Sequence, residues 1–505
     1  MTQSNHNFYQ KFAEKIATQA KECLLITSQD IEYSYADIDQ ESARLANFLS
    51  ELGACVGDRI SVQVEKSPQA VCLYLACLRA GFVFHPLNPA YQASELDYFL
   101  NNAEPSVVIC DSEKSDTLRP IVNAANIQHL LTLNPDGSGG LIDDSRFCST
   151  EFDCVVRAAD DMAALLYSSG TTGVPKGIML THYNLASNAQ ALVEAWGFSR
   201  EDRLLHALPI FHVHGLFVGL GCVLMSGASM RWLPSFNSAS VVNFLPECTV
   251  LMGVPTYYTR LLDEPTFTRK VTNNIRLFVS GSAPLLEETF DQFEQRTGQR
   301  ILERYGMTET NMNSSNPLAG ERRPGTVGPP LPGVDIRIAD ENNTSLPDGD
   351  IGNLQVRGPN VFKGYWKLPE KTAEDFTDDG FFNTGDKGKI DDQGYVYIVG
   401  RSKDVVITGG LNVYPKEVEL VIDAIKGVKE SAVIGVPHAD FGEAVVAIVV
   451  AESEASVNES SIIAHAKSQL ANFKVPKRVV LVNELPRNAM GKVQKNLLRK
   501  DHSDL

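Results

Sequence analysis

Eleven residues rich in glycine and hydroxyl groups run to a lysine and a final glycine: Tyr167-Ser168-Ser169-Gly170-Thr171-Thr172-Gly173-Val174-Pro175-Lys176-Gly177. The apolar run 162–166 before them predicts a short buried strand, and the segment 181–196 after them predicts a capped amphipathic helix. Glycines let backbone N–H groups approach an anion, hydroxyl groups add donors, and the lysine adds a positive charge. We therefore predict a polyphosphate-binding loop between a strand and a helix.

This loop differs from the Walker A motif, which ends in Gly-Lys-Ser/Thr. Here Lys176 follows Pro175 and precedes Gly177, so no hydroxyl stands where that motif binds Mg²⁺. A plain surface loop is the alternative interpretation. The candidate residues that donate hydrogen bonds or charge to the phosphates are Ser168, Ser169, Gly170, Thr171, Thr172, Gly173 and Lys176. By itself the loop predicts a nucleotide and leaves the reaction open.

The same alternation of apolar strands and helical patterns extends to both sides of the loop, over residues 24–156 and again at the candidate strands 249–252 and 277–280, each followed by a helical pattern. It predicts layered α/β subdomains with mainly parallel sheets over about residues 1–334. Residues 335–400 instead carry short strands separated by Asp-Gly and Gln-Gly turns, which predict a small β-rich subdomain of hairpins. The fold class is therefore α/β, with a large N-terminal domain (1–400) and a small α+β C-terminal domain (401–505).

Composition narrows the class of protein. The 505 residues include 45 basic and 62 acidic side chains, a net charge of −17, which argues against a nucleic-acid or anionic-membrane binder. The nine cysteines form no Cys-x-x-Cys pair and indicate reduced thiols. Residues 1–21 lack the apolar core of a signal peptide, and no apolar run is long enough to span a bilayer. We expect a cytoplasmic protein without a membrane segment or an evident obligatory protein partner.

Five motifs together resemble one family. They are the loop 167–177, Tyr305-Gly306-Met307-Thr308-Glu309-Thr310, Thr384-Gly385-Asp386, Gly400-Arg401-Ser402-Lys403-Asp404 and Asn488-Ala489-Met490-Gly491-Lys492. In this order they resemble the acyl-adenylate-forming enzymes, which include acyl-CoA synthetases, firefly luciferase and peptide-synthetase adenylation domains. The resemblance covers essentially the whole chain and implies an AMP-forming acyl-CoA synthetase that uses ATP, CoA and Mg²⁺.

The resemblance implies a role for each motif. A carboxylate must first be converted to a mixed anhydride with AMP, so the main demand is to gather and neutralise negative charges. Thr308 is expected at the phosphates and Glu309 at Mg²⁺, because a hard cation prefers oxygen ligands. Asp386 is expected at the ribose hydroxyls, with Arg401 beside it. The remaining residues expected around ATP or AMP are Glu303, Tyr305, Gly306 and Met307. Taken alone, the Tyr-Gly-x-Thr-Glu motif could cap a helix and Asp386 could be a turn residue.

The C-terminal motifs imply a moving domain. Lys492 is expected to reach the carboxylate and the α-phosphate during adenylation, although a lysine in such a loop is usually solvated. Lys403 matches the family's hinge, where the small domain rotates between the two half-reactions. Gly409 and Gly410 match the loop that lines the pantetheine channel, or form a simple tight turn.

Four residues bear on the acid. His212 and His214 lie in an apolar run where histidines are usually core residues, and no third metal ligand accompanies them. Arg260 lies in a helix that begins with Pro255, where surface exposure is the simpler interpretation. Together with Ser282, however, these segments resemble the malonyl-CoA synthetase branch, in which the matching arginine faces the distal carboxylate of malonate. An unpaired buried arginine costs roughly 3 to 5 kcal/mol, which would disfavour acetate and propionate.

The expected reaction is therefore malonate, ATP and CoA to malonyl-CoA, AMP and diphosphate. Methylmalonate stays open as a second substrate, because one methyl group is worth only about 1 to 3 kcal/mol of discrimination. The alternatives are a ligase for oxalate or an aromatic acid, and an adenylating enzyme that loads a carrier protein. A nucleotide-sensing module without catalysis is the most distant alternative.

Overall fold

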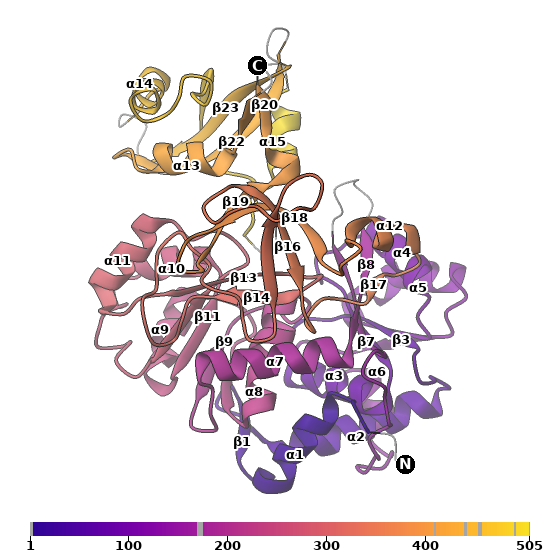
Figure 1. Cartoon of the computed structure of the whole chain (residues 1–505). Coiled ribbons are helices and arrows are strands. Elements are labelled where there is room, and N and C mark those ends of the chain that lie inside the picture. The colour runs from indigo at the N-terminus through magenta and orange to yellow at the C-terminus, as the bar shows by residue number, and fades with distance from the viewer. Residues whose placement is uncertain are drawn as a thin grey trace.

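The computed structural model describes residues 4–168, 175–408, 411–438, 442–452, 457–488 and 491–503. Within them the strands form four sheets, three in the N-terminal part of the chain and one at its C-terminal end (Figure 1). The predicted division into a large N-terminal and a small C-terminal domain is confirmed. None of the helices formed by these residues is long and apolar enough to cross a bilayer.

The first large sheet is parallel except at its two edges. In spatial order it contains β14 (Asn311–Ser315), β13 (Leu302–Met307), β12 (Leu277–Ser280), β11 (Val250–Gly253), β9 (Arg203–His206), β10 (Ser229–Trp232), β1 (Cys23–Thr27) and β2 (Glu32–Ser34). The edge strands β14 and β2 run antiparallel to their neighbours. The carboxyl ends of its six central strands therefore meet at one edge, the usual place for ligands in such sheets.

The second large sheet is parallel over its central strands. Its order is β17 (Gly364–Tyr365), β8 (Lys176–Thr181), β7 (Met162–Ser168), β4 (Val83–Pro86), β3 (Arg59–Gln63), β5 (Val107–Cys110) and β6 (His129–Thr132). β8 pairs antiparallel with both β7 and β17. The predicted strand 162–166 and helix 181–196 are both present, the latter as α7 (His182–Trp196) with a capping box from Thr181.

One detail of the predicted loop is wrong. The loop does not lead directly into the helix but turns back into β8, so it belongs to a β-hairpin. Ser168 and Lys176 are paired residues at the loop end of that hairpin. Residues 176–181 form a strand because Ile178 and Leu180 bury their side chains while the backbone bonds to β7 on one side and to β17 on the other.

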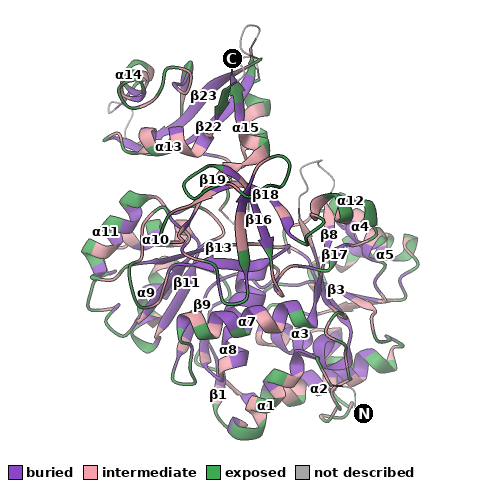
Figure 2. Ribbon diagram, viewed as in Figure 1, coloured by how far each residue is buried: buried purple, intermediate pink, exposed green. Residues whose placement is uncertain are grey.

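Helices cover the large sheets in layers. They are α1 (Tyr9–Gln19), α2 (Tyr35–Glu51), α3 (Pro68–Ala80), α4 (Ala93–Ala103), α5 (Ser115–Ala124), α6 (Gly140–Ser145), α7, α8 (Leu220–Ser226), α9 (Ser238–Phe244), α10 (Pro255–Leu262), α11 (Glu287–Thr297) and α12 (Pro369–Asp375). Alternation along β11 sends Val250 and Met252 into the main core and Leu251 into a second core with α9, α10 and α11. Figure 2 shows the strands buried and the exposed residues on the outer faces of helices such as α11 and α12.

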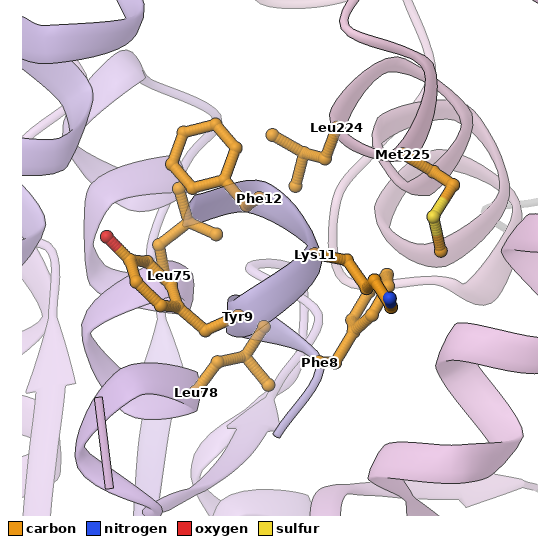
Figure 3. A pocket seen from close by; sticks show the side chains of 8 residues that line it. All are labelled: Phe8, Tyr9, Lys11, Phe12, Leu75, Leu78, Leu224 and Met225. Carbon is orange, nitrogen blue, oxygen red and sulfur yellow. The ribbon is translucent and has the colours of Figure 1, made fainter. Parts of the chain in front are cut away.

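The N-terminal helix closes the main core at one end. α1 packs against α3 and α8 through an almost wholly apolar seam (Figure 3). Its lining residues are Phe8, Tyr9, Lys11, Phe12, Leu75, Leu78, Leu224 and Met225. This seam is core packing, since it contains no group that suits the predicted chemistry.

The β-rich subdomain and the C-terminal domain follow. The third sheet is antiparallel, in the order β15 (Asp335–Ala339), β16 (Gly352–Arg357), β18 (Phe382–Ile390) and β19 (Val396–Arg401), as the hairpin turns predict. The fourth contains β20 (Val406–Thr408), β21 (Leu411–Val413), β22 (Val428–His438), β23 (Gly442–Ala451) and β24 (Arg478–Val482), with α13 (Pro415–Asp423), α14 (Glu459–Gln469) and α15 (Lys495–Asp501). Figure 1 shows this domain beyond β18 and β19, at the end of the molecule opposite α1 and α2.

Candidate active site

Asp386 and Arg401 face each other across the hairpin of β18 and β19. Arg401 and Asp386 form an ion pair, with Nε 2.7 Å from Oδ1, and the hydroxyl of Tyr305 donates to Oδ2. Asp386 lies inside a strand, which removes its interpretation as a plain turn residue. Three residues that the sequence predicts at the nucleotide are thus in direct contact.

A buried carboxylate lies at the loop end of the β7–β8 hairpin. The hydroxyl of Ser168 donates to Oε1 of Glu309 at 3.3 Å, and burial raises the pKa of Glu309. Lys176 lies close by, with Nζ 3.8 Å from the Asp375 carboxylate and 4.0 Å from the centre of the Tyr365 ring. We call Lys176, Tyr305, Glu309, Asp386 and Arg401 the nucleotide end of the site.

Seven predicted residues lie outside the described part of the chain. They are Ser169, Gly170, Thr171, Thr172 and Gly173 of the phosphate loop, and Gly409 and Gly410 of the expected CoA channel. Their expected roles stay predictions.

The Tyr-Gly-x-Thr-Glu motif forms the end of β13 and the start of the turn to β14 rather than a helix cap. Met307 and Thr308 are partly buried there. Position 306 requires glycine because of the adjacent strand β14: a Cβ there would lie 1.9 Å from the carbonyl oxygen of Asn311. The motif predicts that this glycine lets the backbone approach a flat base or acyl group, and the structure adds a reason from internal packing.

Glu303 occupies a different environment from the nucleotide end. It is buried, and desolvation raises its pKa to about 8 while the backbone amides of Gly325 and Leu285 act in the opposite direction. Lys416 of the C-terminal domain also lies within electrostatic reach of this carboxyl group. The structure therefore places Glu303 next to backbone amides, without a described contact to Asp386 or Arg401.

Lys492 reaches the site from the C-terminal domain. Its side chain has an exposed part, but the protein around its ammonium group displaces water and lowers its pKa to about 8. The positive charge of Arg401 lowers it further. Its charge in turn contributes to the lowered pKa of His212. The neighbouring Gly491 docks on α10, since a Cβ there would lie 3.3 Å from Oγ1 of Thr256. The two domains are therefore arranged so that Lys492 lies among the predicted site residues.

The histidine motif forms a short π-helical turn, η2 (His214–Gly219), which we call the π turn. His214 is buried, and its Nδ1 lies 3.3 Å from Oγ of Ser282, whose φ of 72° is left-handed. Burial, with Arg304 as the next cause, holds the pKa of His214 well below its usual value. Burial likewise lowers the pKa of His212 to about 4, so both imidazoles are neutral near pH 7. The predicted pair His214 and Ser282 is thus in contact.

Arg304 is a functional candidate that the sequence analysis missed. It is 4% exposed, and its Nε and Nη2 have no hydrogen-bond partner among the described residues. Burial lowers its pKa to about 9, which leaves it charged at neutral pH. It packs against Gly281, where a Cβ would lie 2.4 Å from Cζ of the arginine. We call His214, Gly281, Ser282 and Arg304 the acid end of the site.

Arg260 lies on the exposed side of α10. It lines a surface cavity of about 310 Å³ whose other lining residues are Phe236, Asn237, Ser238 and Asp263. It forms no ion pair with any described residue, and neither His214 nor Ser282 lines this cavity. The structure therefore brings His214 and Ser282 into contact, whereas Arg260 lines a surface cavity that neither of these residues lines.

The described residues contain no cluster of three or more His, Cys, Asp or Glu side chains suited to a metal ion. His212 and His214 are therefore not part of such a cluster. A cation bound by Glu309 would take its other ligands from a substrate or from water, as Mg²⁺ commonly does.

Known proteins match this chain over nearly its whole length. The family model described as AMP-binding enzyme matches residues 9–366, and that described as AMP-binding enzyme C-terminal domain matches residues 417–492. The chain is 34% identical over 557 residues to a malonate–CoA ligase of Arabidopsis thaliana, covering 99% of this chain and 91% of that protein. It is 37% identical over 516 residues to a mitochondrial malonate–CoA ligase of Bos taurus, covering 94% and 87%.

Solved structures of one further relative distinguish two arrangements. The crystal structure of ATP-bound MatB from Rhodopseudomonas palustris has 52% sequence identity, covers 99% of both chains and gives a TM-score of 0.97. The apo structure of the same protein, at the same identity and coverage, gives 0.87. The present structure is therefore closer to the ATP-bound arrangement of that relative.

Proposed function

Because this chain belongs to the AMP-binding enzyme family, we propose that it is an ATP-dependent malonate–CoA ligase. The carboxylate of malonate would attack the α-phosphorus of ATP and release diphosphate. The thiol of CoA would then attack the carbonyl carbon of the malonyl-adenylate and release AMP. The predicted resemblance to acyl-adenylate-forming enzymes, and the prediction of an AMP-forming acyl-CoA ligase, are confirmed by the family models and the relatives.

The observation that carries the choice of acid is Arg304. A buried guanidinium without an acceptor is strongly unfavourable, and a second carboxylate on the substrate would pair with it. Acetate or propionate would leave it unpaired. Gly281, which packs against Arg304, precedes Ser282 in the chain, and Ser282 contacts His214. The hydroxyl of Ser282 and the neutral imidazole of His214 could donate or accept further hydrogen bonds. Arg260, the arginine chosen from the sequence, could act at the entrance from its surface cavity.

The nucleotide end supplies the remaining charges. In the proposed complex Asp386 accepts hydrogen bonds from the ribose hydroxyls, and Arg401 and Tyr305 hold its carboxylate in place. Lys176 and Thr308 contact the phosphates, with Met307 and Gly306 beside the adenine and acyl groups. Lys492 stabilises the charge that builds up between the carboxylate and the α-phosphate.

Glu309 fits the expected Mg²⁺. It is a buried carboxylate whose described side-chain contact is one hydroxyl at 3.3 Å, and its raised pKa shows that the charged form lacks compensation. A bound Mg²⁺ would neutralise charge on the phosphates and on this carboxylate.

The second half-reaction requires a rearrangement. The greater similarity to an ATP-bound than to an apo relative, and the position of Lys492, support an adenylating arrangement of the domains. We place the hinge at Lys403, an exposed residue in the short helix η4 (Ser402–Asp404) that follows β19. Rotation there would withdraw Lys492 and bring the segment with Gly409 and Gly410 to the site.

The proposal includes a cytoplasmic location. All nine cysteines are free thiols, as a reducing compartment favours. Cell fractionation of the native protein would test this point separately from the enzymology.

The deciding experiment measures CoA-dependent AMP release with malonate, methylmalonate, oxalate, succinate, acetate and a cinnamate supplied separately. We expect malonate to give the highest kcat/KM and acetate to be used at least roughly a hundredfold less well, because acetate leaves Arg304 unpaired. Equal or better use of acetate or cinnamate would overturn the assignment.

A further inference from the structure

A buried lysine ties the two large sheets together next to the π turn. Lys66 follows β3 of the second sheet, immediately before the N-cap of α3, and is 6% exposed. Its Nζ donates to the carbonyl oxygens of His206 and Leu233, each at 2.7 Å, and to Nδ1 of His206 at 2.9 Å. It also lies 4.1 Å from the centre of the Trp232 ring. All three ammonium N–H groups therefore have acceptors, all at the carboxyl ends of β9 and β10.

The ring of His206 passes this restraint to the π turn. Its Nε2 lies 2.9 Å from the carbonyl oxygen of Gly215, and because a carbonyl only accepts, Nε2 carries the proton. Nδ1 is then the acceptor that Lys66 requires. The carbonyl of Gly215 also accepts the N–H of Leu220, the hydrogen bond that defines the π turn.

Gly219 makes room for this contact, since a Cβ there would lie 3.1 Å from Nε2 of His206. Gly215 is itself closely packed, because a Cβ there would lie 2.1 Å from the carbonyl oxygen of Pro209. The turn is thus packed against the imidazole ring without a side chain between them. His214, which contacts Ser282, is the residue next to Gly215 in the chain.

We propose that Lys66 and His206 are positioning residues that fix the π turn and thereby set the affinity of the site for its acid. The path runs from Lys66 through the imidazole of His206 to the carbonyl of Gly215, and from there to His214 at the acid end. This inference rests on the proposed function for the identity of the acid, but it predicts an effect on the acid and not on ATP whichever acid the enzyme prefers. A lysine that served only to join the sheets would change the stability of the fold without separating the two substrates.

The test compares steady-state constants of His206→Leu, His206→Gln, Lys66→Met and Gly219→Ala with those of the wild-type enzyme. His206→Leu removes both ring contacts, and Gly219→Ala pushes the ring away from Gly215 without touching Lys66. We expect these two variants and Lys66→Met to raise KM for the acid roughly tenfold to a hundredfold, with KM for ATP changed less than twofold, because a small displacement of a substrate contact has effects of that size. His206→Gln keeps an N–H donor near the position of Nε2 and should restore most of the acid affinity.

The matched control is His182→Leu, another buried histidine, whose Nδ1 accepts the backbone N–H of Phe8 in the N-terminal segment. We expect it to lower the melting temperature while leaving both KM values unchanged. Parallel increases in both KM values, or a lower melting temperature with an unchanged acid KM, would overturn the positioning role. If Lys66→Met does not fold, Gly219→Ala and the two His206 variants decide the question.

The wild-type acid panel separates this inference from the proposed function. If wild type prefers another acid, the function assignment fails. The same variants then test the positioning role with that acid.

Discussion

The two ends of the site differ in how their charges are compensated before any substrate binds. At the nucleotide end Asp386 is paired with Arg401 and Tyr305, and Lys176 lies near Asp375. At the acid end Arg304 is buried with two nitrogen atoms lacking a partner in the described chain.

This difference has a physical consequence. Apart from a cation at Glu309, a ligand at the nucleotide end exchanges existing hydrogen bonds and ion pairs for new ones, so the net gain for each contact is modest. A ligand at the acid end relieves an uncompensated buried charge, so its second carboxylate contributes to affinity and to discrimination at once. Substitutions should therefore have their largest and most acid-selective effects at Arg304.

The strongest test of this contrast is Arg304→Met. Removing a buried, hydrogen-bonding charge should lower kcat/KM for malonate by roughly 30- to 5,000-fold, equivalent to about 2 to 5 kcal/mol, while acetate is affected far less. Arg260→Met is the matched control, an exposed arginine on α10, and should have a smaller effect. The measurement is kcat/KM for both acids with each variant. Equal losses for malonate and acetate would remove Arg304 from the recognition of the second carboxylate.

Lys492→Ala tests the contact between the domains. We expect adenylation, measured as malonate-dependent exchange of diphosphate into ATP, to fall roughly 100- to 1,000-fold, because a positioned charge at the reacting centre is removed. Formation of the thioester from synthetic malonyl-adenylate should continue, since Lys492 is withdrawn in that step. Lys500→Ala, an exposed lysine in α15, serves as the control. Similar losses in both half-reactions would contradict the domain rotation.

The pH profile gives a third, smaller test. The pKa of Lys492 is lowered to about 8, so its charge is present below that value and is lost as the pH rises through it. We expect kcat/KM for adenylation to decline above about pH 8 by up to tenfold per pH unit, as this parameter reports the free enzyme. Bound anions would raise this pKa, so kcat itself should decline at higher pH. Lys492→Arg should move the limb of kcat/KM upward, and an unchanged profile would assign it to another group.

Several elements of the fold and part of the nucleotide end could be predicted from local sequence patterns. The strand before the phosphate loop, the capped helix α7 and the antiparallel third sheet follow from residue periodicity and turn residues, which act over short distances. Asp386 and Arg401 were predicted at the nucleotide from their motifs, and the register of β18 and β19 brings them into contact.

The remaining features depend on contacts between distant segments. The unpartnered state of Arg304 depends on its packing against Gly281, and arginine in a strand is not by itself informative. The exposure of Arg260 depends on which face of α10 meets the core. The pairing of β8 on its other edge depends on β17, which lies nearly 200 residues later in the chain. A sequence pattern alone does not contain such long-range contacts; the one available signal was the pair of charged residues Glu303 and Arg304 in the segment 302–305.

The smallest expected effect concerns the pairing of Lys176. Its ammonium lies 3.8 Å from the Asp375 carboxylate and would have to leave this partner to contact a phosphate. Asp375→Asn removes the competing charge, so we expect KM for ATP to fall by roughly two- to fivefold, which corresponds to the modest value of a partly exposed ion pair. Glu374→Gln on the same helix is the control, because Glu374 pairs with Lys371 rather than with Lys176. Both variants are measured by ATP titration at saturating acid. An increase in the ATP KM for Asp375→Asn would mean that Asp375 orients Lys176 toward the phosphates instead of competing with them. The contrast between the two ends of the site would then not extend to Lys176.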